Sequence, residues 1–193
     1  MAESGKVVQL FQKPEDFIPS RARQLKLGKC YISNYWEDGN IANVIVSRCH
    51  INGNFTIGIY LIDFTCLGIK DASLRFNISS EELESFIVLI EAKEIEYSKV
   101  HNIIYGAKYF AERCGFKPYH QWEIAKFILE EDDDRIPLTG IDFGENGVPA
   151  YYVTPDDDPA MIKNILATLD KHIGHGNYFF YQDAQLNNSP KQV

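Results

Sequence analysis

The stretch that decides the fold spans residues 41–63 and reads IANVIVSRCH-INGN-FTIGIYLID. Its two long halves are rich in β-branched and aromatic residues, which favour extended strands. Between them lies Asn52-Gly53, a pair typical of a two-residue type I′ turn because both turn positions need positive φ. The stretch therefore predicts an antiparallel β-hairpin.

The position of the turn sets which residues of the hairpin face each other. With Asn52-Gly53 at its centre, Val46 lies opposite Ile59 and Arg48 lies opposite Ile57, and one face of the hairpin is largely apolar. A longer loop with a bulge would move the side chains of one strand to the other face. The sequence favours the first register and leaves the second open.

Local capping signals predict three helices outside the hairpin. Ser79, with Glu82 three residues later, forms a capping box at a helix start. A longer helix begins near Ser98 and ends at Gly115, which suits the left-handed position after a helix. The last helix begins at Asp158-Pro159, an N-cap residue followed by a residue suited to the first turn. Its buried face is expected to contain Met161, Ile162, Ile165, Leu166, Leu169 and Ile173.

Shorter strands are expected on either side of these elements, and together they indicate the fold class. They fall at residues 30–34, 140–143, 150–153 and 178–181. Asn146-Gly147 offers a turn between the second and the third. Runs of strands and helices without regular alternation indicate an α+β fold. We expect an antiparallel hairpin-based sheet packed against two or three amphipathic helices, in one domain over residues 1–183, and a disordered tail over 184–193.

Charge and hydropathy exclude several classes of protein. The 193 residues include 27 Asp and Glu against 19 Lys and Arg, a formal net charge of −8. This sign argues against non-specific binding to DNA or RNA, which relies on Lys and Arg to neutralise phosphates. The most apolar stretch, residues 55–69, is shorter than a membrane-spanning helix and contains Asp63. We therefore expect no membrane association.

Two further features indicate a cytoplasmic protein. The N-terminus, MAESGK, lacks the apolar core of a signal peptide. The cysteines Cys30, Cys49, Cys66 and Cys114 show neither C-x-x-C spacing nor a zinc-finger pairing with histidine. We expect their thiols to be reduced in the cytosol.

The sequence contains none of the common catalytic or phosphate-binding motifs. G-x-x-x-x-G-K-[ST], G-x-G-x-x-G, G-x-S-x-G and H-E-x-x-H are all absent. The leading hypothesis is therefore a non-enzymatic binding or adaptor domain. Its protein partner would contact an exposed face of the hairpin, or Tyr105 and Tyr109, which lie opposite the apolar face of the long helix. The alternative is that a loop partly covers these tyrosines.

The most concentrated polar segment runs from Asp63 to Asp71 and reads DFTCLGIKD. In a thiol-dependent hydrolase Cys66 would be the nucleophile, and it would need a base or a positive neighbour to lower its pKa. Lys70 is near in sequence and His101 is the best histidine candidate, so the catalytic set would be Asp63, Cys66, Lys70 and His101. The alternative is a buried free cysteine beside a turn in which Asp63 accepts hydrogen bonds from backbone amides.

The same segment also allows a metal-dependent phosphoesterase. Asp63 and Asp71 would then hold Mg²⁺ together with Glu91 or Glu94. The acidic run 130–134 offers further carboxylates, but it lacks the alternate-position ligands and the glycine of an EF-hand loop. We interpret this run as a solvated loop.

Several longer motifs resemble those of known sequences. The patterns YLIDxxCLGIKD at 60–71, HNIIYGA at 101–107 and GFKP at 115–118 resemble a group of uncharacterised bacterial proteins, over roughly residues 25–160. The resemblance implies a bacterial, cytosolic origin. It implies no activity, cofactor or site residue.

Overall fold

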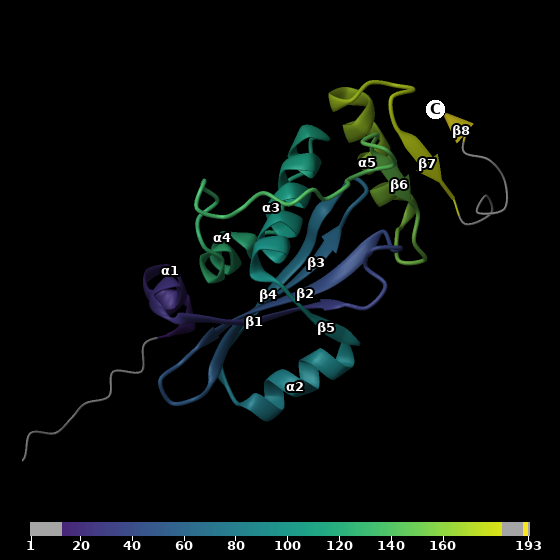
Figure 1. The fold of residues 1–193 in the computed structure, drawn as a ribbon. Coiled ribbons are helices and arrows are strands. Elements are labelled where there is room, and N and C mark those ends of the chain that lie inside the picture. Colours follow the sequence, from purple (N-terminus) through teal and green to yellow (C-terminus); the bar gives the residue numbers. More distant parts are fainter. Residues whose placement is uncertain (1–12, 183–190, 193) are drawn as a thin grey trace, which may run out of the picture.

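A five-stranded antiparallel sheet with the strand order β4-β3-β2-β1-β5 organises the fold (Figure 1). The computed structural model describes residues 13–182 and 191–192. The strands of the sheet are β1 (Lys26–Ser33), β2 (Ile41–Cys49), β3 (Phe55–Asp63), β4 (Gly68–Ile78) and β5 (Ala92–Ile95). The expected α+β class, with a hairpin-based antiparallel sheet, is confirmed.

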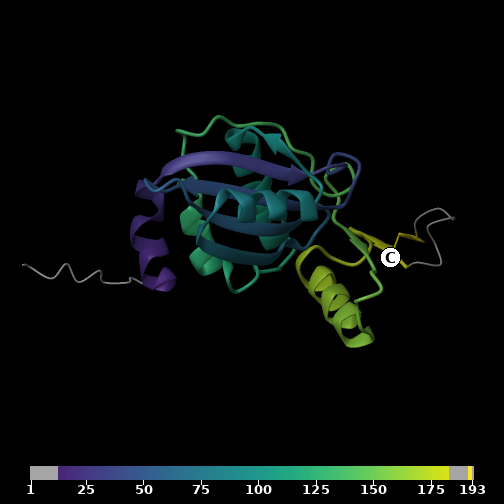
Figure 2. The same ribbon diagram turned by 90° about the horizontal axis from the view of Figure 1, so that it is seen from below.

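Helices cover both faces of this sheet, and the last helix of the chain lies to one side of it (Figure 1, Figure 2). They are α1 (Pro14–Arg21), α2 (Ser80–Leu89), α3 (Tyr97–Arg113), α4 (Trp122–Ala125) and α5 (Pro159–His172), with short 3₁₀ turns at Ala22–Gln24 and Lys126–Ile128. α2 packs on one face over Ile45 and Ile57, and α3 packs on the other over Val44, Val46 and Tyr60. Successive residues of β2 therefore enter two different cores, as the geometry of a strand requires. Among the described residues, no helix combines the length and apolar character needed to cross a bilayer.

The C-terminal part adds a second, smaller sheet beside the end of α3 (Figure 1). Its strands are β6 (Ala150–Tyr152), β7 (Phe179–Tyr181) and β8 (Lys191–Gln192), in the order β6-β7-β8, with β6 and β7 parallel. Phe110 and Cys114 at the end of α3 pack with Ile165 and Leu169 of α5. This contact joins the C-terminal part to the main sheet through α3.

The β2–β3 hairpin forms, but its register differs by one residue from the favoured prediction. Arg48 lies opposite Thr56 and not opposite Ile57. The shift follows from the loop, which is longer than the predicted two-residue turn. The alternative with a longer loop is therefore correct, and the favoured register is wrong.

Two Asn-Gly pairs in this chain adopt different turns. At the β2–β3 loop, Gly53 N–H donates to His50 O (3.1 Å), His50 N–H donates to Asn54 O (2.8 Å), and Gly53 has φ +87°. These bonds define a type I turn followed by a left-handed glycine. Asn146-Gly147 has φ +52° and +84°, as a type I′ turn requires. The Asn-Gly pair therefore predicts the turn correctly at residues 146–147 and wrongly at residues 52–53.

The capping predictions are confirmed. Ser79 and Glu82 form the reciprocal capping box at the start of α2. The carboxylate of Asp158 accepts from Met161 N–H at the start of α5 (2.7 Å). Gly115 follows α3 with φ +90°. These signals are correct because each depends only on residues within one helical turn.

Other local expectations have mixed outcomes. The strands expected at 30–34, 150–153 and 178–181 correspond to parts of β1, β6 and β7. The expected strand at residues 140–143 does not form; Ile141 and Phe143 of this segment instead pack on the core beside α3. Met161 was expected on the buried face of α5 but is 41% exposed in the first turn of that helix. In the predicted tail, residues 184–190 and 193 lie outside the described residues, while Lys191–Gln192 pair with β7.

A buried arginine joins the sheet to the segment that follows α4. Arg48 is 1% exposed. Its guanidinium donates to Ile128 O (2.8 Å) and Leu25 O (3.2 Å), and it forms an ion pair with Glu130 (2.8 Å). A charge so far from water needs such partners, because its desolvation is costly. The contacts of Arg48 therefore attach residues 128–130 to β2.

Removing the negative partner of Arg48 should destabilise the fold. We expect Glu130→Gln to lower the free energy of unfolding by about 2 kcal/mol, the scale of a hydrogen bond to a charged group. Urea denaturation measures this change. The matched control is Glu131→Gln, whose side chain is 65% exposed and pairs with Arg23. The control should cost less than about 1 kcal/mol, as surface ion pairs do. Equal losses in the two variants would contradict the role of the buried pair.

Candidate functional site

One carboxylate oxygen organises the turn between β3 and β4. Asp63 Oδ1 accepts from the backbone N–H groups of Thr65 (2.8 Å), Cys66 (2.8 Å) and Leu67 (3.0 Å), and from the Thr65 hydroxyl (2.9 Å). Asp63 is 7% exposed, so these donors replace the water that would otherwise solvate its charge. This arrangement matches the alternative considered for the segment 63–71, in which Asp63 accepts hydrogen bonds from backbone amides beside a buried cysteine.

The main chain of this turn holds two other loops in place. Phe64 N–H donates to Asn40 O in the β1–β2 loop (2.9 Å), and Phe64 O accepts from Gly144 N–H in the loop before β6 (2.8 Å). Thr65 O accepts from Ala150 N–H at the start of β6 (3.1 Å). Three segments that are far apart in the sequence therefore meet at one place.

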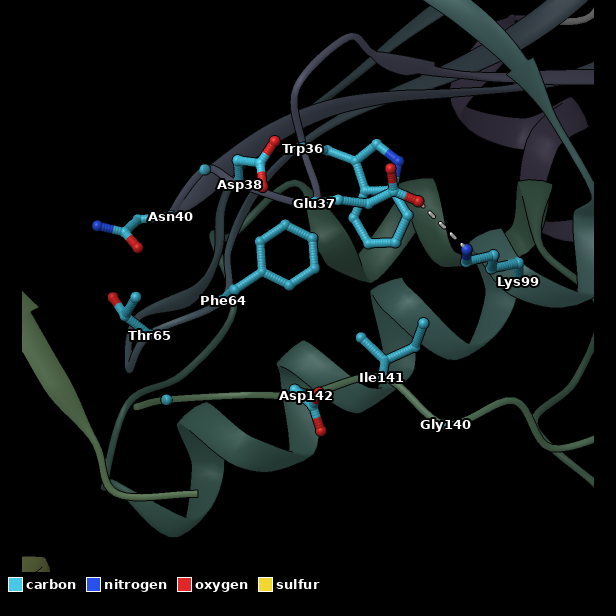
Figure 3. Close-up of a pocket in the computed structure, with 12 residues that line it drawn as sticks. Trp36, Glu37, Asp38, Asn40, Phe64, Thr65, Lys99, Gly140, Ile141 and Asp142 are labelled. Carbon is cyan, nitrogen blue, oxygen red and sulfur yellow. Dashed lines mark ion pairs between the residues drawn. The ribbon is translucent and has the colours of Figure 1, made fainter. Parts of the chain in front are cut away.

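These three loops and the first turn of α3 enclose a pocket of about 410 Å³, which we call the loop pocket (Figure 3). The lining consists of residues 36–40, Phe64, Thr65, Lys99, residues 140–142 and Gly144. A pocket of this volume suits a small molecule or a single long side chain.

Aromatic rings form the inner wall of the loop pocket. Trp36 packs on Phe64 with ring centroids 5.8 Å apart, Phe64 on Phe143 at 6.0 Å, and Phe143 on Phe110 of α3 at 5.9 Å. Tilted and offset contacts of this kind are favourable between aromatic rings. The row connects the wall of the pocket to the core beside α3, which holds that wall in place.

A lysine closes one end of the loop pocket. The Lys99 ammonium lies 4.8 Å from the centre of the Trp36 ring and 3.7 Å from a Glu37 carboxylate oxygen (Figure 3). Glu37 also pairs with Lys93 at 3.6 Å. The charge of Glu37 is therefore compensated, and one face of Trp36 already carries a cation.

Two carboxylates of the loop pocket are not compensated. Asp38 and Asp142 are exposed, and they flank Phe64 in Figure 3. Neither forms an ion pair with any residue in the described part of the chain. Two free negative charges beside an aromatic wall favour a positively charged ligand.

The predicted catalytic residues near Cys66 come together only in part. Asp63 and Cys66 share the β3–β4 turn, and Lys70 follows near the start of β4. Cys66 is 1% exposed and packs with Cys114. Burial, together with the charge of Asp63, holds the pKa of the Cys66 thiol well above its usual value and outweighs the opposing charge of Lys70. A thiolate nucleophile needs the opposite shift.

His101 is remote from Cys66. It lies in the second turn of α3, whereas Cys66 packs beside Cys114 at the other end, about 20 Å away along the helix axis. His101 is 2% exposed, and its ring packs against those of Tyr97 and Tyr105, with centroids 5.8 and 4.6 Å away. The structure therefore does not bring His101 to the predicted nucleophile.

The carboxylates of the predicted Mg²⁺ site are also separated. The Asp63 carboxylate is engaged by the turn, and Asp71 is exposed on β4. Glu91 and Glu94 lie just before and within β5, at the opposite edge of the sheet, where Glu94 pairs with Lys29 (2.6 Å). Over residues 13–182 and 191–192, no three His, Cys, Asp or Glu side chains gather as a metal site requires.

The acidic run 130–134 is bound to the rest of the protein through its first residues, which we call the acidic strap (residues 130–132). Glu131 pairs with Arg23 (2.9 Å), and Asp132 accepts from the Tyr109 hydroxyl (2.7 Å). With the Glu130–Arg48 pair, these contacts anchor residues 130–132, while residues 131–134 stay exposed, as expected for a solvated loop. These contacts could not be predicted from the sequence, because the partners come from distant segments.

The strap also accounts for the two tyrosines proposed as a partner surface. Tyr105 packs on Trp122 (ring centroids 5.5 Å apart), and its hydroxyl donates to Glu130 O (3.5 Å). Tyr109 bonds to Asp132 and remains 46% exposed. A loop therefore covers this face in part, as in the alternative considered for these residues.

The chain matches no protein-family model, no curated protein and no solved structure. The loop pocket is therefore judged on its own geometry.

Sequence reasoning did not find the residues of the loop pocket. Trp36 and Asp38 lie in a polar loop, and Asp142 lies in a segment expected to be a strand. No spacing links them, because their proximity depends on the hydrogen bonds of Phe64. The one local signal was Asp63, which lies next to the pocket and shapes it without lining it.

The burial of Cys66 should make it slow to react. In the folded protein, we expect iodoacetamide at neutral pH to alkylate Cys49, the one cysteine that is not fully buried, well before Cys66. Peptide mapping by mass spectrometry measures the four rates, and labelling in urea, where all four should react alike, is the control. Preferential labelling of Cys66 in the folded protein would instead restore the thiol-enzyme hypothesis.

The burial of His101 should make the fold less stable in mild acid. Burial lowers the pKa of His101 below its ordinary value of 6.5, against the opposing charge of Asp132. The unfolded state therefore binds more protons as the pH falls through about 6.5, and the free energy of unfolding decreases. Burial lowers the pKa of His50 as well, which adds to the trend.

The variant His101→Phe isolates the contribution of His101. Urea denaturation between about pH 7.5 and pH 5 should show a shallower loss of stability in this variant than in the wild type. His120→Asn, at an exposed histidine, is the control and should keep the wild-type slope. An unchanged slope in His101→Phe would show that His101 does not contribute.

Proposed function

We propose that this protein is a non-enzymatic binding domain, and that the loop pocket receives a basic side chain, lysine or arginine, of a protein partner. The observation that carries the proposal is the pair of uncompensated carboxylates, Asp38 and Asp142, on either side of an aromatic wall. A guanidinium or ammonium group in the pocket would be attracted by both negative charges.

The geometry of the pocket supports a long, narrow ligand group. The cation would be attracted toward Asp38 and Asp142, and its methylene chain would contact Phe64 and Trp36, which line the pocket. Lys99 cannot supply this charge from within the chain, because it is held by Glu37. The net charge of −8 would also draw basic partners toward the protein.

The loop pocket is a better candidate for the binding site than the Tyr105/Tyr109 surface, and a binding function is better supported than a hydrolase. The Tyr105/Tyr109 surface is already engaged by the acidic strap, although Tyr109 keeps part of its ring accessible. The hydrolase alternative needs Cys66 and His101, or Asp63 and Asp71, to converge, and no observation favours that.

We propose a cytoplasmic location for the same binding function. Four cysteines are present, and in the structure all four are free thiols, although Cys66 and Cys114 pack in one cluster. Free thiols persist in reducing compartments. The motif resemblance alone supports a bacterial origin. We expect no non-specific binding to nucleic acid.

Binding of basic peptides tests the proposed function. We expect a fluorescein-labelled Arg- and Lys-rich peptide to bind the full chain in fluorescence polarisation, and Asp38→Asn and Asp142→Asn each to weaken binding about tenfold. Asp156→Asn, an exposed acid in the turn before α5, is the matched control and should bind as the wild type does.

The comparison between peptides distinguishes the pocket from general charge attraction. A peptide with Glu in place of each Arg and Lys should not bind. Loss of affinity that is equal in Asp38→Asn, Asp142→Asn and Asp156→Asn would mean that net charge alone binds the peptide, and the proposed site would then be rejected.

A further inference from the structure

A lysine of the chain itself already occupies one end of the loop pocket. Lys99 lines the pocket, and its ammonium lies 4.8 Å from the centre of the Trp36 ring (Figure 3). Phe64 packs against the same ring with the centroids 5.8 Å apart, and only 8% of Trp36 is exposed. Little of the aromatic surface of Trp36 is therefore left for the basic side chain of a partner.

The contacts that hold Lys99 in this place are weak. Glu37 lies 3.7 Å from Lys99 and 3.6 Å from Lys93, and both distances are longer than those of hydrogen-bonded ion pairs. The side chain of Glu37 is 57% exposed and that of Lys99 is 35% exposed, so water screens the attraction between their charges. The Lys99 ammonium can therefore move away at a small cost.

The position of Lys99 in its helix is unfavourable for a cation. Lys99 is the third residue of α3, and the first turn of this helix contains no acidic residue. The N-terminal end of a helix carries a partial positive charge, which repels an ammonium group. The helix itself therefore gives no reason for a lysine at this position.

Lys99 and the two free carboxylates of the loop pocket have different partners. Lys99 pairs with Glu37, whereas Asp38 and Asp142 pair with no described residue. A ligand cation drawn to these carboxylates would share a space of about 410 Å³ with the Lys99 ammonium. Charges within a pocket of this size are close enough to repel each other at physiological salt. The two cations would therefore interfere without occupying the same position.

We propose that Lys99 is a tethered competitor of the basic ligand and limits the affinity of the loop pocket, an inference that rests on the proposed function of this pocket. A basic side chain that enters the pocket is repelled by the charge of Lys99. It also meets a Trp36 ring whose face Lys99 already covers in part, so it gains less from contact with the ring. Loss of the charge of Lys99 therefore strengthens binding.

Neutralising Lys99 tests the proposal. In fluorescence polarisation with the labelled Arg- and Lys-rich peptide, Lys99→Met should bind about three- to tenfold more tightly than the wild type. Methionine keeps much of the apolar stem of lysine and removes only the charge. The conservative variant Lys99→Arg keeps the charge and can also stack on the Trp36 ring, so it should not show the gain.

Lys108 supplies a matched control on the same helix. Its ammonium lies 4.3 Å from the centre of the Tyr109 ring and 2.8 Å from a Glu112 carboxylate oxygen. Lys108→Met therefore removes the same charge and the same two kinds of contact, at a residue that does not line the loop pocket. This variant should bind the peptide as the wild type does. Circular dichroism and urea denaturation verify that all three variants keep the fold.

The outcomes separate this inference from the proposed function. Unchanged or weaker binding in Lys99→Met would overturn the inference. An equal gain in Lys99→Met and Lys108→Met would overturn it too, because net charge alone would then explain the gain. In both cases the loop pocket would remain the binding site if Asp38→Asn and Asp142→Asn still weaken binding.

A wild type that does not bind the peptide also gives a clear result. Binding that appears only in Lys99→Met would support the inference, since the wild-type pocket would then be blocked by its own lysine. Absence of binding in both proteins would overturn the inference and the proposed function together.

Discussion

The fold and the candidate site both depend on the four hydrogen bonds that Asp63 Oδ1 accepts. They close the turn that ends β3 and begins β4, in a place too buried for water to solvate the carboxylate. The turn fixes the backbone of Phe64, which in turn holds the two loops that form the loop pocket. It also aligns β4 beside β3. The buried Asp63 thereby positions the walls of the loop pocket without lining the pocket itself.

The sequence was informative wherever the physical cause is local. A capping box, an Asp-Pro helix start and a glycine after a helix depend on a few adjacent residues, and all three were predicted correctly. The Asn52-Gly53 turn failed although its chemistry is also local. Two loop lengths are compatible with Asn-Gly, and packing on both faces of the sheet selects between them. Arg48 shares a face with Val44 and Val46 in either register, and on that face it binds Glu130; the register decides only which residues of β3 lie opposite them.

The loop pocket and the acidic strap could not be predicted from the sequence, for a related reason. Arg48 and Glu130, or Asp38 and Asp142, are far apart in the chain, and nothing in their own neighbourhoods indicates that they converge. Several acidic side chains have partners within the chain: Glu130 pairs with Arg48, Glu131 pairs with Arg23, and Asp158 caps a helix. The carboxylates without a partner therefore say more about possible ligands than the net charge does. In the loop pocket these carboxylates are Asp38 and Asp142.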